Sequence, residues 1–179
     1  GLTLQFWGDI IMEQPQLVSE LPRDVIALEW GYEANHPFAE HAARFAASGV
    51  PFYLCPGTSS WNSVAGRTDN ALGNLRSAAT AALQHGAVGY LVTDWGDNGH
   101  WQPLAVSLLL FAYGAGLAWR GGEEDAAAAE ESVATALNAY LFGDESNRMA
   151  QCAASLGRVD QLLKMPVHNS AMLFQILQP

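Results

Sequence analysis

The chain has 179 residues, half of them hydrophobic, which is enough for one domain with a substantial core. Its 18 acidic and 8 basic residues give a net charge of -10, so a nucleic-acid backbone or an anionic membrane surface would be repelled. The longest apolar stretch, Leu104 to Ala118, falls short of the roughly 20 residues that cross a bilayer. We expect a soluble protein whose partners include neither nucleic acid nor a membrane.

Four short apolar runs in the first hundred residues predict buried strands, and the segments between them have helical spacing. The runs are Leu2 to Phe6, Val25 to Leu28, Val50 to Leu54 and Val88 to Val92, and the helical segments are 17–21, 37–47 and 69–85. This alternation predicts right-handed βαβ units in a parallel sheet. Because the strands are continuously apolar, we expect helices or other segments on both faces of the sheet.

After about residue 120 the pattern becomes helical. Glu123, Glu124 and Asp125 form an acidic first turn that suits the start of an alanine-rich helix ending near Gly143. Two further helices are expected over 146–163 and 169–177. The sequence thus predicts an α/β unit over 1–120 and a helical extension over 121–179, which packs on the outside of the sheet and contributes no chemistry.

Each predicted strand is followed by tryptophan among Gly, Asp, Glu or Ser. Ligands of α/β proteins bind outside the carboxyl ends of parallel strands, so these residues predict a pocket. Flat rings beside carboxylates suit a sugar, although tryptophan is also a common core residue and aspartate a common helix cap. The candidate binding residues are Trp7, Asp9, Trp30, Tyr32, Glu33, Trp61, Asp94, Trp95, Asp97, His100 and Trp101. Asp94 follows an apolar strand directly, so its carboxylate should have a partner or a ligand.

Four segments at these strand ends carry a family resemblance over roughly residues 2 to 120. They are Phe6-Trp7-Gly8-Asp9-Ile10-Ile11, Ile26 to Glu33 with Asn35-His36-Pro37-Phe38, Pro51 to Ser63, and Leu91 to Pro103. Together they resemble a bacterial branch of glycoside hydrolase family 20, the β-N-acetylhexosaminidases built on a TIM barrel. The resemblance implies substrate-assisted retaining hydrolysis, in which the acetamido oxygen of the sugar attacks the anomeric carbon and a glutamic acid protonates the leaving group.

The resemblance also places the strands within the barrel. Trp95-Gly96-Asp97 resembles the Trp-x-Glu of the last strand, with Asp in place of Glu, while Trp30 and Tyr32 resemble pocket aromatics of the sixth strand and Trp61 one of the seventh. The chain would then form about half of a (β/α)₈ barrel. The family's catalytic Asp-Glu pair ends the fourth strand, which would precede this chain, and Glu124-Asp125 and Asp144-Glu145 lie in the helical extension.

We therefore expect a fragment that is inactive alone. Its partners would be a glycan with terminal N-acetylhexosamine and either the missing half of the barrel or a second copy that pairs with the exposed sheet edges. Two alternatives stay open. One is a carbohydrate-binding domain without hydrolytic activity, and the other is a retaining glycosidase that uses two carboxylates of this chain, such as Glu33 and Asp97.

Metal and cofactor chemistry have weak support in the sequence. Asp94, Asp97 and His100 lie within seven residues, but there is no HExxH motif or paired-cysteine spacing, and the glycines do not fit a phosphate-binding loop. Cys55 and Cys152 suggest no disulfide framework. We expect no metal and no cofactor. No signal peptide is recognisable, and the compartment, cytoplasmic or periplasmic, stays open together with the exact sugar and linkage.

Overall fold

The structure, a computed structural model, describes residues 1–121 and 125–178, without the side chain of Asp160. It is an α/β fold with a four-stranded parallel sheet in the order β1-β2-β3-β4. The strands are β1 (Leu4–Trp7), β2 (Val25–Trp30), β3 (Phe52–Cys55) and β4 (Gly89–Tyr90). The predicted α/β class and parallel strand arrangement are confirmed. Each expected strand is present, with β4 shorter than predicted.

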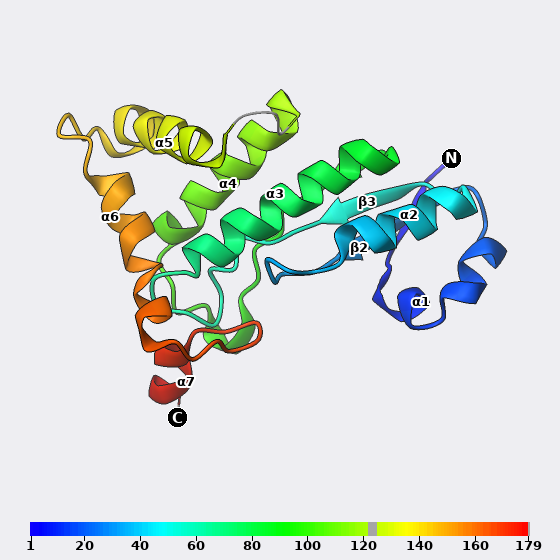
Figure 1. Cartoon of the computed structure of the whole chain (residues 1–179), viewed down its shortest axis with the longest axis horizontal. Helices are drawn as coiled ribbons and strands as arrows, with labels where there is room; N and C mark the ends of the chain where they lie inside the picture. Colours follow the sequence, from blue (N-terminus) through cyan, green and yellow to red (C-terminus); the bar gives the residue numbers. More distant parts are fainter. Residues whose placement is uncertain (122–124, 179) are drawn as a thin grey trace.

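Helices pack closely against one face of the sheet (Figure 1). They are α2 (Phe38–Ser48) and α3 (Thr68–His85), whereas α1 (Asp9–Glu13) and η1 (Pro15–Glu20) precede β2, with η1 packed on α2. Helices α2 and α3 both end at a glycine with positive φ, Gly49 and Gly86, as the apolar spacing predicted. A first core lies between these helices and the sheet, with Phe38, Phe45 and Leu54 fully buried in it.

The opposite face of the sheet is less covered. Along β2, Ala27 and Glu29 are buried on the helical side, whereas Ile26 and Trp30 on the other side are partly exposed. On β1, Leu4 and Trp7 are exposed. The expectation of a sheet covered on both faces is therefore wrong at β1, an edge strand that pairs with β2 alone among the described strands.

Beyond the sheet the chain is helical, as predicted (Figure 1). The elements are α4 (Leu104–Arg120), α5 (Ala126–Leu137), η3 (Asn138–Phe142), α6 (Met149–Leu156), η4 (Val159–Leu163) and α7 (Met172–Leu177). A second core, with Leu75, Leu110 and Tyr113 buried, joins α3 and α4 to the tail helices. None of the helices in the described ranges is both long and apolar enough to cross a membrane.

Two acidic residues of the tail, Asp125 and Asp144, act as helix caps. Glu123 and Glu124, expected at the start of the alanine-rich helix, lie outside the described residues. The Asp125 carboxylate accepts hydrogen bonds from the N–H groups of Ala127 and Ala128 and so caps α5. Asp144 accepts hydrogen bonds from the backbone N–H groups at the start of α6. It therefore caps this helix and does not lie at the end of a strand, where a catalytic acid would be expected.

Candidate functional site

A cavity of about 310 Å³ lies at the carboxyl ends of β1 and β2. Its described lining consists of Trp7, Asp9, Trp30, Tyr32, Trp95, Asp97 and Asn169. We call it the aromatic pocket. Six of these seven residues are among those selected from the sequence, so the recurring tryptophans at strand ends do meet in space. The volume is at the lower end of the range typical of small-molecule sites.

The chain after β4 continues alongside β3 and brings Trp95 to the pocket. Leu91 N donates to Leu54 O and Thr93 N donates to Pro56 O, so pairing extends past the assigned strand. The Trp95 indole N–H then donates to the Tyr32 hydroxyl at 2.7 Å. This bond ties the segment after β4 to the segment after β2.

The four rings form two contacting pairs. Trp30 and Tyr32 stack, with centroids 5.0 Å apart and planes 25° apart. Trp7 and Trp95 are tilted by 55° with centroids 5.8 Å apart, and both are partly exposed. Contacts between rings hold their orientation, which leaves faces available to a ligand at low entropic cost.

The Tyr32 hydroxyl is held in its neutral form. Burial raises the pKa of this phenol to about 12, although hydrogen bonds with Thr93 and Trp95 favour the charged form. At neutral pH the group is a hydroxyl that accepts from Trp95 and has one proton, which Thr93 or a ligand oxygen can accept. A sugar oxygen is a suitable acceptor for such a donor.

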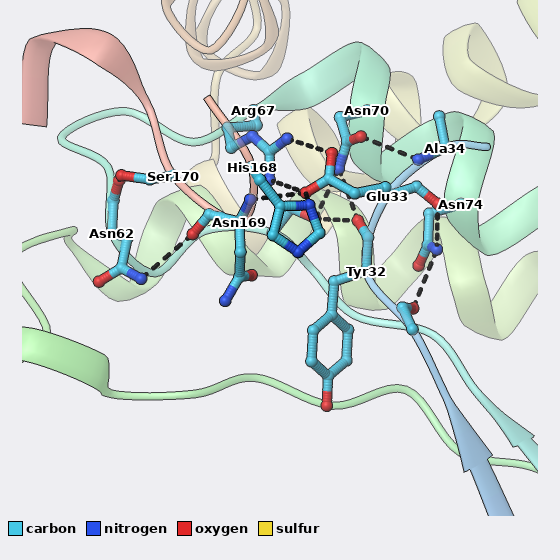
Figure 2. A network of polar contacts seen from close by, with 12 residues as sticks. Tyr32, Glu33, Ala34, Asn62, Arg67, Asn70, Asn74, His168, Asn169 and Ser170 are labelled. Atoms are coloured by element: carbon cyan, nitrogen blue, oxygen red, sulfur yellow. Dashed lines mark hydrogen bonds and ion pairs between the residues drawn. The ribbon is translucent and has the colours of Figure 1, made fainter. Parts of the chain in front are cut away.

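Glu33 is absent from the described lining of the aromatic pocket and forms an ion pair with Arg67 (Figure 2). Its carboxylate accepts two hydrogen bonds from the Arg67 guanidinium, at 3.0 and 2.6 Å, and a third from the backbone N–H of Asn169 at 2.7 Å. Burial raises the pKa of Glu33, but the bonds from Arg67 and Asn169 outweigh it, and the net pKa lies below its ordinary value. Glu33 therefore anchors the C-terminal tail, and it lies outside the described lining of the aromatic pocket.

The C-terminal tail reaches the site, so the expectation that it contributes nothing there is wrong. Asn169, in the turn before α7, lines the aromatic pocket, and its side chain points to the same side as the Tyr32 ring (Figure 2). The Asn169 carbonyl oxygen accepts from the Asn62 amide, and its side-chain oxygen accepts from the Trp61 indole N–H. Ser170 donates to the Asn62 carbonyl. Residues 168–170 are thereby fastened to the loop after β3.

Removing Arg67 should loosen this fastening. In Arg67→Ala, the Glu33 carboxylate stays partly buried without its charged partner, and we expect the free energy of unfolding to fall by about 2–3 kcal/mol. Because the pKa of Glu33 is lowered on folding, the contribution of its charge is present above the ordinary pKa of 4.5 and is lost as the pH falls through the lowered pKa. Urea denaturation at neutral and acidic pH measures both effects.

Arg44→Ala is the matched control, because Arg44 forms an exposed ion pair with Glu40 within α2. A surface pair of this kind contributes about 0–1 kcal/mol. Equal losses in the two variants would show that the pair of Arg67 and Glu33 does not anchor the tail.

Four other predicted site residues lie behind or beside the pocket. Trp61 is buried beneath it, with its ring edge-on to Tyr32 at 4.8 Å. Asp94 accepts hydrogen bonds from the hydroxyls of Thr58 and Ser60, which confirms that it has partners. The remaining two are His100, which lies beside Gln102, and Trp101, which packs edge-on against Phe174 of α7. Trp61, Asp94, His100 and Trp101 are thus absent from the described lining of the pocket, and Trp61 contacts one of its rings.

The structure also shows a cluster that the sequence reasoning missed. Glu29, His36 and His41 bring three possible metal-ligand atoms within 4.8 Å of one another. The spacing considered from sequence, Asp94 with Asp97 and His100, makes no such cluster in the described ranges. A glutamate inside an otherwise apolar strand, followed by two histidines, was the available signal.

No known protein-family model matches the chain, and comparison with curated proteins also gives no match. What the site binds is therefore inferred from its geometry.

Proposed function

We propose that the aromatic pocket binds a terminal N-acetylhexosamine residue of a glycan. The observation that carries this proposal is the meeting of four aromatic rings with the carboxylates of Asp9 and Asp97 in one cavity of about 310 Å³. Pyranose rings have apolar C–H faces that stack on aromatic rings, and hydroxyls around their edge that donate to carboxylates. The pocket has both aromatic rings and carboxylates, and they come from different elements of the fold.

Tyr32 supports an N-acetylated sugar in particular. Its neutral hydroxyl donates to a carbonyl oxygen such as that of the acetamido group, and its ring stacks on Trp30 to give an apolar wall for the acetamido methyl. The amide of Asn169 adds a polar group to the same cavity. A plain hexose would leave these partners unused.

We further propose that the sheet is about half of a (β/α)₈ barrel. In its support, all four strands are parallel and neighbour one another in chain order, as consecutive barrel strands do. The outer strands β1 and β4 each have one neighbour among the described strands, so each leaves an edge for further strands. A missing barrel half or a second copy would pair there.

The described lining of this pocket includes the carboxylates of Asp9 and Asp97 but no adjacent Asp-Glu pair. The proposed reaction is substrate-assisted retaining hydrolysis, with the catalytic Asp-Glu pair on polypeptide outside these 179 residues. The alternative of two carboxylates within this chain has less support, because the ion pair with Arg67 and the bond from Asn169 occupy Glu33.

Hydrolysis assays on two substrates test this function. The 179-residue chain alone should cleave neither an aryl N-acetylglucosaminide nor the matching glucoside, because a general acid contributes roughly 10²–10⁴-fold. A longer protein that supplies the Asp-Glu pair should cleave the first substrate and spare the second, which has no acetamido nucleophile.

Each other outcome selects an alternative. Hydrolysis of the glucoside by the isolated chain, abolished in Glu33→Gln or Asp97→Asn, would establish the two-carboxylate mechanism. Saturable sugar binding without turnover in the longer protein would establish a binding domain.

A further inference from the structure

The Glu29–His36–His41 cluster joins the end of β2 to α2. Glu29 lies in β2 and is 1% exposed, His36 lies in the loop that follows, and His41 lies in the first turns of α2. One carboxylate oxygen, Oε1, contacts His36 Nε2 at 3.0 Å and His41 Nδ1 at 2.5 Å. Three ligands of two types that transition metals favour, one carboxylate and two imidazoles, therefore converge from three successive segments of the chain.

The second carboxylate oxygen of Glu29 has no hydrogen-bond partner among the described residues, although it is fully buried. A buried acceptor without a partner costs about 1–3 kcal/mol, so such atoms are rare and call for a physical reason. His36 and His41 both contact Oε1, so neither provides a partner for the second oxygen, and the cost remains. A cation held between the carboxylate and the imidazoles would offset it, since it attracts both carboxylate oxygens.

We propose that Glu29, His36 and His41 bind one zinc-like divalent ion. Carboxylate and two imidazoles are an established ligand set for Zn²⁺, with bonds of about 2.0–2.2 Å that place tetrahedral ligand atoms about 3.3 Å apart. The contacts of 2.5 and 3.0 Å need to open by less than an ångström. This proposal does not depend on the proposed sugar binding, and it differs from the expectation of no metal drawn from the sequence.

The surroundings hold the histidines and leave a route for the ion. The His36 ring lies so close to Gly31 that a Cβ there would be 2.2 Å from it, which explains the glycine at this position. His36 also packs edge-on against Phe38 at 4.5 Å and against His41 at 5.3 Å. All three cluster residues line a second cavity of about 410 Å³, which supplies an entry path and room for a water as fourth ligand.

The charge of the cluster suits a cation. Glu29 contributes a carboxylate, and His36 and His41 contribute imidazoles, which bind a cation through a neutral ring nitrogen. An ion here would connect β2 to α2 directly beneath the segment that carries Trp30 and Tyr32. Its role would be to hold that segment in place.

Zinc loading of the whole chain tests this site. After stripping with a chelator and reloading, the chain should retain one Zn²⁺ per molecule after gel filtration, measured by atomic emission. His36→Asn and His41→Asn should each weaken binding by more than the roughly 100-fold that follows loss of a mere outer-shell partner. Because His36 is partly exposed, His36→Asn is the variant expected to keep its fold, as checked by circular dichroism.

Two controls separate this site from adventitious binding. His85→Asn, at the end of α3, and Cys152→Ser, at an exposed cysteine, should both retain one ion. With Co²⁺ in place of zinc, the absorption spectrum should lack thiolate charge-transfer bands. Binding of less than half an equivalent by the unmodified chain, or equal affinity in folded His36→Asn, would overturn the proposal.

Discussion

Replacing Trp95 with alanine is expected to weaken N-acetylhexosamine binding by roughly 30-fold or more. Loss of one stacking ring removes about 2 kcal/mol of apolar contact, and each 1.4 kcal/mol is a factor of ten in Kd. The change also removes the indole donor to Tyr32 and the contact with Trp7. Calorimetric titration with N-acetylglucosamine measures the effect.

Trp119→Ala is the matched control for this experiment. Trp119 lies near the end of α4, is 92% exposed and is absent from the described lining of the aromatic pocket. It should bind the sugar as the unmodified chain does. If Trp95→Ala binds normally but unfolds more easily, Trp95 has a packing role and the pocket assignment is wrong.

Trp61→Ala should have the largest effect on stability, lowering the free energy of unfolding by about 3–5 kcal/mol. Trp61 is 1% exposed, packs against the Tyr32 ring and donates its indole N–H to Asn169. The variant leaves a cavity under the pocket and an acceptor without its donor. Chemical denaturation monitored by circular dichroism gives the value.

Trp61→Phe separates the two contributions. A phenyl ring retains most of the packing but cannot donate to Asn169, so a loss of about 1–3 kcal/mol is expected, less than for alanine. An alanine variant within 1 kcal/mol of the unmodified chain would show that Trp61 does not support the site.

The tendency of ligand sites in α/β proteins to lie at the carboxyl ends of parallel strands accounts for what the sequence predicted well. Trp7, Trp30 and Trp95 are far apart along the chain, but each lies at or beyond the carboxyl end of a strand of one parallel sheet, so their meeting at one edge was predictable. Trp61 also follows a strand, β3, but it is buried beneath the aromatic pocket and does not line it. The reason is local: Gly57 has no side chain, and a Cβ there would be 2.4 Å from the Trp61 ring, so this glycine admits the indole into the interior.

The contribution of Asn169 could not be predicted in the same way. Its backbone N–H bonds to Glu33 across 136 positions of the chain, and no local pattern specifies where a helical tail folds back. The same interaction gives Glu33 an anchoring role that the sequence did not predict. Acidic residues at strand ends are thus predictable as a group, whereas the partner of each depends on tertiary packing.

The metal cluster was missed for a different reason. Glu29 precedes Trp30 in the sequence, but alternation along β2 points the two side chains to opposite faces of the sheet. Glu29 therefore meets His41 of α2 on the helical side, while Trp30 lines the pocket on the other. Predictions from strand ends alone cover the face of the sheet that lines the pocket and leave out the helical face.

The most direct test of sugar recognition is nuclear magnetic resonance of the tryptophan indole N–H groups during titration with N-acetylglucosamine. The account predicts saturable shifts of the Trp7, Trp30 and Trp95 signals, no shift of Trp119, and a much weaker response to glucose. Unchanged signals from the three pocket tryptophans at millimolar sugar, or equal responses to the two sugars, would contradict it.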